Sequence, residues 1–154
     1  MSVWVQISMP VPVFWRAKTL AQMTPEEFES VCDGCGKCCL HKLEDEDNGD
    51  VYFTKVACRF LDHETCKCQT YSDRQQQVAD CVVLTPDTVK ATYWLPDTCA
   101  YRLLDQGTPL FDWHPLVSGD PNSVHRAGMS VARQVVNENS VDLTDLEEYI
   151  VRWV

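Results

Sequence analysis

Four of the nine cysteines of this chain stand close together, at Cys32, Cys35, Cys38 and Cys39. Two residues separate Cys32 from Cys35 and Cys35 from Cys38, so one short loop can direct three thiolates at a single metal centre. The ligand loops of zinc sites and of iron–sulfur clusters share this spacing. Two glycines inside the loop permit the positive φ angles that a tight ligand loop needs. The block therefore predicts a metal site that constrains the fold around it.

The other cysteines lie downstream, at Cys58, Cys66, Cys68, Cys81 and Cys99. A four-ligand set requires at least one of them to fold back onto the loop. Others are expected to be small buried hydrophobic residues, above all Cys99 in a predicted helix. The adjacent side chains of Cys38 and Cys39 diverge, so either one binds while the other packs, or the two bind different metals.

The spacing favours iron over zinc only slightly. Three cysteines at two-residue intervals with one remote cysteine are similar to the ligands of bacterial ferredoxins, although the Cys-Pro step found there is missing. Zinc sites usually pair two Cys-x2–4-Cys knuckles, whereas Cys66 and Cys68 are separated by a single residue. We therefore expect an iron–sulfur cluster of the 4Fe–4S type, with zinc as the alternative.

Two other uses of cysteine fit less well. A disulfide framework is disfavoured by the odd number of cysteines and by an N-terminus that lacks the pattern of a secretion signal. A thioredoxin-type redox pair at Cys32 and Cys35 would need a βαβ context that the sequence does not show. Metal ligation is the interpretation that explains the clustered spacing.

The charge composition of the chain limits the kinds of partner that the protein is expected to bind. The chain has 154 residues, 13 basic against 23 acidic side chains and a formal charge of -10. A field of that sign repels phosphate backbones and anionic lipids, so we expect no nucleic-acid partner and no membrane association. Without a run of about 20 apolar residues or a signal peptide, the protein is expected to be cytoplasmic. The length predicts a single cysteine-rich domain, 1–154.

The predicted fold class is α+β: a small loop-rich domain with several short helices and a β-hairpin around the cysteine metal site. Prolines at positions 10 and 12 predict an extended N-terminal arm over 1–21. A capping box at Thr24 and Glu27 predicts a helix ending near Val31. The pair Asn48-Gly49 predicts a hairpin between the runs 40–46 and 50–57.

The rest of the chain alternates loops with short elements. Residues 58–81 are expected to form an irregular loop with a short helix. The cap-plus-proline pattern at Thr85 predicts a helix to about Leu95, and Asp97 predicts a second helix over 98–104. The β-branched run 129–136 predicts a strand, and Asp142 or Thr144 begins a last helix that reaches Trp153.

Other polar residues have competing interpretations. His41 is either a further metal ligand or a surface residue on a strand. His114 is expected to fix a turn by hydrogen bonding, while His63 and His125 look solvated. Lys37 and Arg59 stand near the thiolates and could offset the charge of a cluster, although such surface charges often have no measurable effect.

Several segments together resemble a known family: Cys32-Asp-Gly-Cys-Gly-Lys-Cys-Cys39, Thr65-Cys-Lys-Cys68, Trp94-Leu-Pro-Asp-Thr-Cys99 and Trp113-His-Pro-Leu116. They are similar to the bacterial YcgN-type family, within the CxxCxxCC group of zinc- or iron-chelating domain proteins. The pattern of that wider domain falls on Cys32, Cys35, Cys38, Cys39, Cys58, Cys68, Tyr71, Arg74 and Cys81. Gln75 stands where the domain often has proline.

The resemblance implies metal chelation by a cytosolic bacterial protein, with Cys58, Cys68 or Cys81 completing the site. A similar cysteine domain in a flagellin lysine methylase carries an iron–sulfur cluster, which supports iron by analogy. Methyl transfer is not carried over, because the chain lacks the glycine-rich strand-to-helix turn of a nucleotide-binding fold.

Three functions follow as hypotheses. The first is a metal- or cluster-binding protein in metal handling, redox sensing or electron transfer. The second is an interaction module with structural zinc, whose acidic face binds a basic protein partner. The third is an enzyme, either a thiol-redox or a cluster-dependent one, which needs an exposed thiolate of low pKa. We expect a binding protein rather than an enzyme.

Overall fold

The computed structural model describes residues 13–77, 81 and 83–154. Its regular elements are short and are separated by turns and loops, which confirms the loop-rich α+β class. The α-helices are α1 (Phe14–Ala17), α2 (Pro25–Ser30), α3 (Arg74–Gln77), α4 (Pro86–Ala91), α5 (Ala100–Asp105), α6 (Pro115–Ser118) and α7 (Ser123–Arg126). The strands are β1 (Leu40–Glu44), β2 (Val51–Ala57) and β3 (Val136–Asn137). The 3-10 helices are η1 (Leu20–Gln22), η2 (Lys37–Cys39), η3 (Tyr71–Asp73), η4 (Glu138–Ser140) and η5 (Leu143–Tyr149).

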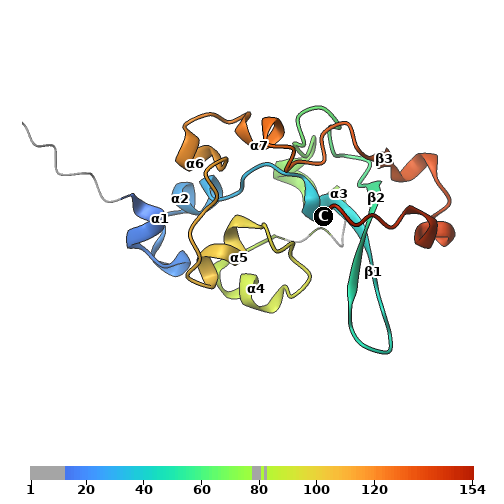
Figure 1. The fold of residues 1–154 in the computed structure, drawn as a ribbon, viewed down its shortest axis with the longest axis horizontal. Helices are drawn as coiled ribbons and strands as arrows, with labels where there is room; N and C mark the ends of the chain where they lie inside the picture. The colour runs from blue at the N-terminus through green and yellow to red at the C-terminus, as the bar shows by residue number, and fades with distance from the viewer. Residues whose placement is uncertain (1–12, 78–80, 82) are drawn as a thin grey trace, which may run out of the picture.

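Most of the α-helices lie at the left and centre of Figure 1, the β1–β2 hairpin projects downward from the other half, and the red C-terminal helical turns lie at the far right. None of the helices within the described ranges has the length and apolar character needed to cross a bilayer.

The start of α2 confirms the capping-box prediction. The Glu27 N–H donates to the Thr24 hydroxyl at 3.1 Å, and the Thr24 N–H donates to the Glu27 carboxylate at 2.9 Å. Pro25 occupies the first helical position, where its missing N–H costs nothing. The helix ends at Ser30, one residue before the predicted end, and delivers the chain directly to the cysteine block.

The β-hairpin is also confirmed. Strands β1 and β2 pair antiparallel, with a register shift between Leu40 and Lys42. Gly49 has a φ of 76° in the connecting turn, a conformation that glycine adopts without a Cβ penalty. β3 pairs parallel to β2 through Val56 and Val136, so the sheet has a third strand that the sequence patterns did not separate from a longer run.

Three predicted elements are wrong in extent. The strand over 129–136 is mostly turn, because the Val131 N–H donates to Cys35 O and the Arg133 N–H donates to His63 O instead of forming a ladder. The helix that begins after Thr85 ends at Ala91 rather than Leu95. The next helix begins at Ala100, with Cys99 and not Asp97 at its N-cap.

The structure also differs from the predictions for the N-terminal arm and for the last helix. The described part of the predicted arm contains two helical turns. In α1 the Val13 carbonyl accepts from the N–H groups of Arg16 and Ala17, and in η1 the Thr19 carbonyl accepts from the Gln22 N–H. The remainder of that arm, 1–12, lies outside the described residues. Asp142 does cap the last helix, but that helix is the 3-10 helix η5, with a kink at Asp145, and Trp153 lies beyond it.

Two hydrophobic clusters form the core. The first packs the N-terminal and central helices around Val31, Leu95 and Tyr101. The second packs the sheet and the C-terminal loops around Leu40 and Val131. Because Val31 belongs to the first cluster and Leu40 to the second, the cysteine block 32–39 connects the two clusters along the chain.

Candidate metal centre

The cysteine loop has the tight turns that its glycines predict. The Asp33 carboxylate accepts a hydrogen bond from the Cys35 N–H at 2.9 Å. Gly34 and Gly36 have φ angles of 78° and 77°, both left-handed. The Cys39 N–H then donates to the Gly36 carbonyl at 3.1 Å and closes η2. The loop therefore turns twice within a few residues and keeps its cysteines in one region.

Gly36 is where the loop presses against the rest of the protein. A Cβ on this residue would lie 2.8 Å from Val131 Cγ2 and 3.1 Å from Cys66 Cβ. The Val131 N–H also donates to the Cys35 carbonyl at 2.9 Å. The C-terminal segment thus fixes the position of the loop, and Cys66, only 6% exposed, belongs to the hydrophobic cluster beneath it.

The loop thiols influence one another electrostatically. Cys32 keeps exposed surface, yet the dense protein around its thiol raises the pKa to about 12, and the charge of Cys38 contributes to this rise. Burial raises the pKa of Cys35 well above its usual range, with contributions from Asp33 and Cys38. In the metal-free protein these two thiols are therefore protonated at neutral pH.

A second set of cysteines meets at the base of the hairpin. The Cys58 N–H donates to the Cys39 carbonyl at 2.9 Å. Cys68 is brought to the same turn by an antiparallel bridge with Leu61. The charges of Cys58 and Cys68 both contribute to raising the pKa of Cys39 and of Cys81. The backbone contacts therefore bring Cys39, Cys58 and Cys68 together at the base of the hairpin.

Cys38 and Cys39 link the thiols of the cysteine loop to the cysteines at the base of the hairpin. A hydrogen bond between their side chains lowers the pKa of Cys38 to about 7 and raises that of Cys39. The positive charge of Lys42 also favours the Cys38 thiolate. Cys38 is therefore the thiol of this pair that ionises first.

Two lysines, the buried Lys37 and the half-buried Lys42, flank the cysteines without a carboxylate partner in the described ranges. Lys37 is 2% exposed, and its Nζ donates to Thr98 Oγ1 at 2.9 Å. Lys42 Nζ donates to the carbonyls of Cys38 and Leu40 at 3.0 and 2.7 Å, and lies 4.4 Å from the ring centroid of Trp94. A buried ammonium group normally requires an opposite charge. For Lys42, the Cys38 thiolate is such a charge, since the positive charge of Lys42 lowers the pKa of Cys38.

The arrangement fits a thiolate-bound metal in chemical kind but does not form a closed ligand cage. Soft sulfur donors select zinc and iron–sulfur clusters. Within residues 13–77, 81 and 83–154, however, no three His, Cys, Asp or Glu side chains are positioned to hold an ion together. Asp33 Oδ2 is buried and has no hydrogen-bond partner there. The structure thus gathers the predicted cysteines, while their coordination to a metal stays a prediction.

Arg59 has a carboxylate partner, unlike Lys37 and Lys42. Its guanidinium lies 3.3 Å from the Glu138 carboxylate, which also accepts from the Arg59 N–H at 2.9 Å. The positive charge still lowers the pKa of Cys58, against a larger rise from burial. The guanidinium of Arg59 therefore interacts with both the Glu138 carboxylate and the Cys58 thiol. His41 Nε2 lies 3.5 Å from the same carboxylate of Glu138.

The other histidines have structural contacts. His114 is 1% exposed; its Nδ1 accepts from the Leu116 N–H at 2.9 Å, so its Nε2 donates to the Val31 carbonyl at 2.7 Å. This confirms the turn-fixing role and anchors the residue before Cys32. The prediction that His63 and His125 are solvated is wrong. His125 Nδ1 lies 2.7 Å from the Ser130 hydroxyl, and His63 Nε2 is buried without a partner among the described residues.

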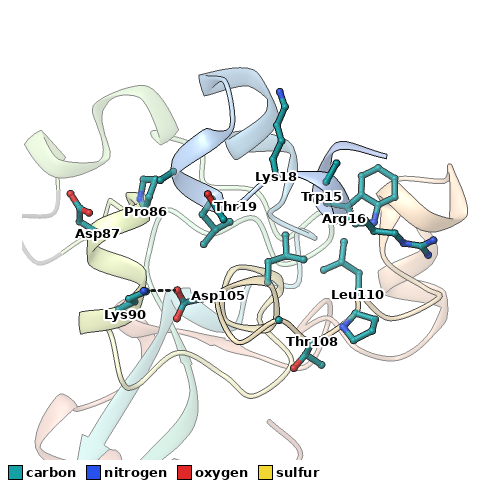
Figure 2. A pocket seen from close by; sticks show the side chains of 16 residues that line it. Trp15, Arg16, Lys18, Thr19, Pro86, Asp87, Lys90, Asp105, Thr108 and Leu110 are labelled. Carbon is teal, nitrogen blue, oxygen red and sulfur yellow. Dashed lines mark ion pairs between the residues drawn. The ribbon is translucent and has the colours of Figure 1, made fainter. Parts of the chain in front are cut away.

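A cavity of about 840 Å³ lies away from the cysteines, between α1, η1, α4 and the end of α5. Figure 2 shows Trp15 and Arg16 at one side of it and the ion pair of Lys90 with Asp105, at 3.9 Å, at another. None of its lining residues is a cysteine or a histidine. The cavity is therefore separate from the candidate metal centre.

Comparisons with known proteins agree with this chemistry. A family model named CxxCxxCC and described as "Putative zinc- or iron-chelating domain" matches residues 31–100. It supports metal binding without choosing between the two metals, and it ends just after Cys99. No solved structure gives a significant match.

Full-length relatives define the family. A UPF0260 protein of Cellvibrio japonicus is 75% identical over 142 residues, covering 92% of this chain and 97% of the relative. A UPF0260 protein of Marinobacter nauticus is 57% identical over 92% of this chain and 95% of the relative. One from Rhizobium leguminosarum is 54% identical over 91% and 88%. On this similarity, and with the CxxCxxCC domain that it carries, the chain belongs to the UPF0260 family of bacterial proteins.

Proposed function

We propose that this protein binds a metal through cysteine thiolates and acts in metal handling or redox chemistry in the cytoplasm, as a single domain. The proposed ligands are those that the sequence predicts: Cys32, Cys35, Cys38, Cys39, Cys58, Cys68 and Cys81. The reducing cytoplasm suits a chain whose cysteines are all free thiols.

The observation that carries the proposal is the position of the buried Lys37 and the half-buried Lys42 beside the clustered cysteines, with no carboxylate partner in the described part of the chain. Thiols alone would pack as small hydrophobic side chains and would need no cation nearby. Metal thiolate centres with four cysteines carry net negative charge, and Lys37 and Lys42 lie where they would balance it. The CxxCxxCC match supports the same chemistry.

We propose an iron–sulfur cluster in preference to zinc. The support is the two-residue spacing of the loop cysteines, which ferredoxin-type ligand sets share, together with the absence of a second two-to-four-residue knuckle in the sequence. A bound cluster would supply one-electron chemistry, whereas bound zinc would stabilise the fold.

A pair of variants tests the ligand assignment. Cys35→Ser removes a loop thiol, so we expect the purified protein to lose stoichiometric metal. Cys66→Ala is the matched control, because it removes a buried cysteine from the hydrophobic cluster and is expected to keep the metal. Full metal retention by Cys35→Ser, with metal loss in Cys66→Ala, would contradict the proposed ligands.

A further inference from the structure

The cavity between α1, η1, α4 and the end of α5 has the size of a small-molecule site. Its volume of about 840 Å³ lies within the range of roughly 300–1,000 Å³ that is typical of such sites. The lining residues come from three segments that are far apart in the sequence, 15–21, 86–90 and 104–110. The cavity therefore depends on the folded arrangement of these segments and has a chemistry of its own, separate from the cysteines.

Leucine side chains give the cavity an apolar wall. Leu20 is 7% exposed, and Leu104 and Leu110 pack against the same hydrophobic cluster. A second cavity of about 210 Å³ shares Leu20 and Pro86 with the first. The other residues that line this second cavity are Met23, Pro25, Phe28, Leu84 and Thr85. An organic ligand with apolar side chains would therefore bury apolar surface here, which favours binding.

One side of the main cavity carries hydrogen-bond donors that have no acceptor. In residues 13–77, 81 and 83–154, neither the Arg16 guanidinium nor the Trp15 indole N–H donates a hydrogen bond. Lys18 differs, because its Nζ lies 2.7 Å from the Glu27 carboxylate. A carboxylate on a ligand can therefore bind at Arg16 and Trp15 without displacing a protein group.

Another side carries a carboxylate that has no donor. The Asp105 side chain is only 21% exposed, and no N–H or O–H group of the described chain donates to it. Lys90 Nζ lies 3.9 Å away, beyond hydrogen-bond distance, on a side chain that is 75% exposed. Polar groups with so little exposure normally have a hydrogen-bond partner. An ammonium group on a ligand would supply that partner for Asp105.

The charged groups lie at separate sides of the cavity. Figure 2 shows Trp15 and Arg16 at one side and Asp105 with Lys90 at another. A single α-amino acid carries its ammonium and carboxylate groups on one carbon atom, so it presents both to the same place. A short peptide carries them at opposite ends with its side chains between. The arrangement of the cavity therefore matches a short peptide with apolar side chains.

We propose that this cavity binds a short zwitterionic peptide with apolar side chains. Its N-terminal ammonium donates to the Asp105 carboxylate, and its C-terminal carboxylate accepts from the Arg16 guanidinium and the Trp15 indole N–H. The side chains of the peptide pack against the leucine wall at Leu20 and Leu104. The site shares no residue with the candidate metal centre, so the inference does not depend on metal binding.

Calorimetric titration of the full-length protein with leucyl-leucine tests the proposal. N-acetyl-leucyl-leucine, which lacks the ammonium group, and leucyl-leucine amide, which lacks the carboxylate, are the matched probes. We expect saturable binding of leucyl-leucine and weaker binding of both modified peptides. If either modified peptide binds as tightly as leucyl-leucine, the assigned charge contact is wrong. The absence of saturable binding of leucyl-leucine at millimolar concentration overturns the proposal.

Variants of the charged residues assign each contact. Asp105→Asn should weaken the binding of leucyl-leucine about tenfold, as loss of a hydrogen bond between charged groups does, and should leave N-acetyl-leucyl-leucine unaffected. Arg16→Met should weaken it by roughly 2–5-fold, because this side chain is exposed. Lys90→Met removes a competing ammonium group and should tighten binding. Arg152→Met, at an exposed arginine outside the cavity, is the control. Equal affinities of Asp105→Asn and the wild type for leucyl-leucine contradict the assigned contact.

A nuclear magnetic resonance titration of the wild type locates the peptide without relying on those variants. The indole N–H signal of Trp15, assigned with Trp15→Phe, should shift as leucyl-leucine is added. The indole signals of Trp113 and Trp153, which do not line the cavity, should stay in place. A Trp15 signal that does not move while leucyl-leucine binds would place the peptide elsewhere and overturn the proposal.

Discussion

The Nζ atom of Lys37 donates a hydrogen bond to Thr98 Oγ1 at 2.9 Å, across 61 residues of sequence. This contact joins the cysteine loop to the start of α5 and buries an ammonium group that has no carboxylate partner in the described part of the chain. A buried cation of this kind is costly unless an anion stands nearby. Under the proposed function, thiolates bound to a metal would supply that anion.

Replacing Lys37 by Met tests this charge balance, because Met keeps most of the apolar stem. Loss of the cation is expected to weaken metal binding by roughly 10–100-fold, the usual effect of removing an outer-shell partner. The same change should leave the metal-free protein as stable or more stable, since an uncompensated buried charge is removed. Chelator competition and urea unfolding measure the two effects. Lys90→Met, at an exposed lysine, is the control; equal losses of affinity in both variants would contradict the assigned role.

Gly36 and Gly34 form a matched pair for testing how the loop is seated. Both are left-handed, so alanine at either position costs about 1–2 kcal/mol in backbone strain. Only at position 36 would the new methyl group meet Val131 Cγ2, at 2.8 Å, whereas nothing lies within 4 Å at position 34. Gly36→Ala should therefore cost roughly 1–3 kcal/mol more than Gly34→Ala, by overpacking. Urea unfolding gives the difference, and equal losses would show that the loop does not press on the C-terminal segment.

The Cys38 thiol predicts a specific pH dependence in the metal-free protein. The hydrogen bond from Cys39 lowers its pKa to about 7, and the charge of Lys42 helps. A thiol with lowered pKa is protonated below that value and becomes a nucleophilic thiolate as the pH rises through it. Iodoacetamide should therefore label Cys38 first, with a rate that rises from pH 6 to 8, before the labelling of Cys32, whose pKa is about 12.

Lys42→Met provides the check on the cause of this reactivity. Removing the ammonium group takes away a charge that favours the thiolate, so the midpoint of Cys38 labelling should move to higher pH. A midpoint that stays in place in Lys42→Met would mean that the hydrogen bond from Cys39 acts alone. Labelling of Cys32 ahead of Cys38 in the wild type would contradict the electrostatic arrangement of the loop.

Local patterns predicted the parts of the fold that depend on local contacts. The capping box of α2 and the Asn48-Gly49 hairpin are complete within a few residues, so the sequence alone was sufficient. The run 129–136 has the β-branched composition of a strand, but its N–H groups bond to Cys35 and His63, which are remote in sequence. Composition cannot reveal such partners, and the predicted strand was therefore wrong over most of its length.

In the candidate site, too, the sequence predicted the features that depend on local contacts and not those that depend on remote ones. The spacing from Cys32 to Cys39 indicates the loop ligands, and the glycines between them have the predicted φ angles. Cys99 was predicted to be a packing residue, and it does pack against the first hydrophobic cluster, although it lies at the N-cap of α5 and not inside the helix.

The most direct test of the central claim is the content of iron, zinc and acid-labile sulfide in protein purified without oxygen, together with its visible spectrum. We expect stoichiometric metal. For the proposed clusters, the protein should be brown and contain about four iron and four sulfide for each 4Fe–4S centre. A colourless protein with one or two zinc ions per chain would retain thiolate binding and contradict the cluster. A folded protein with far less than one metal ion per chain would contradict the account as a whole.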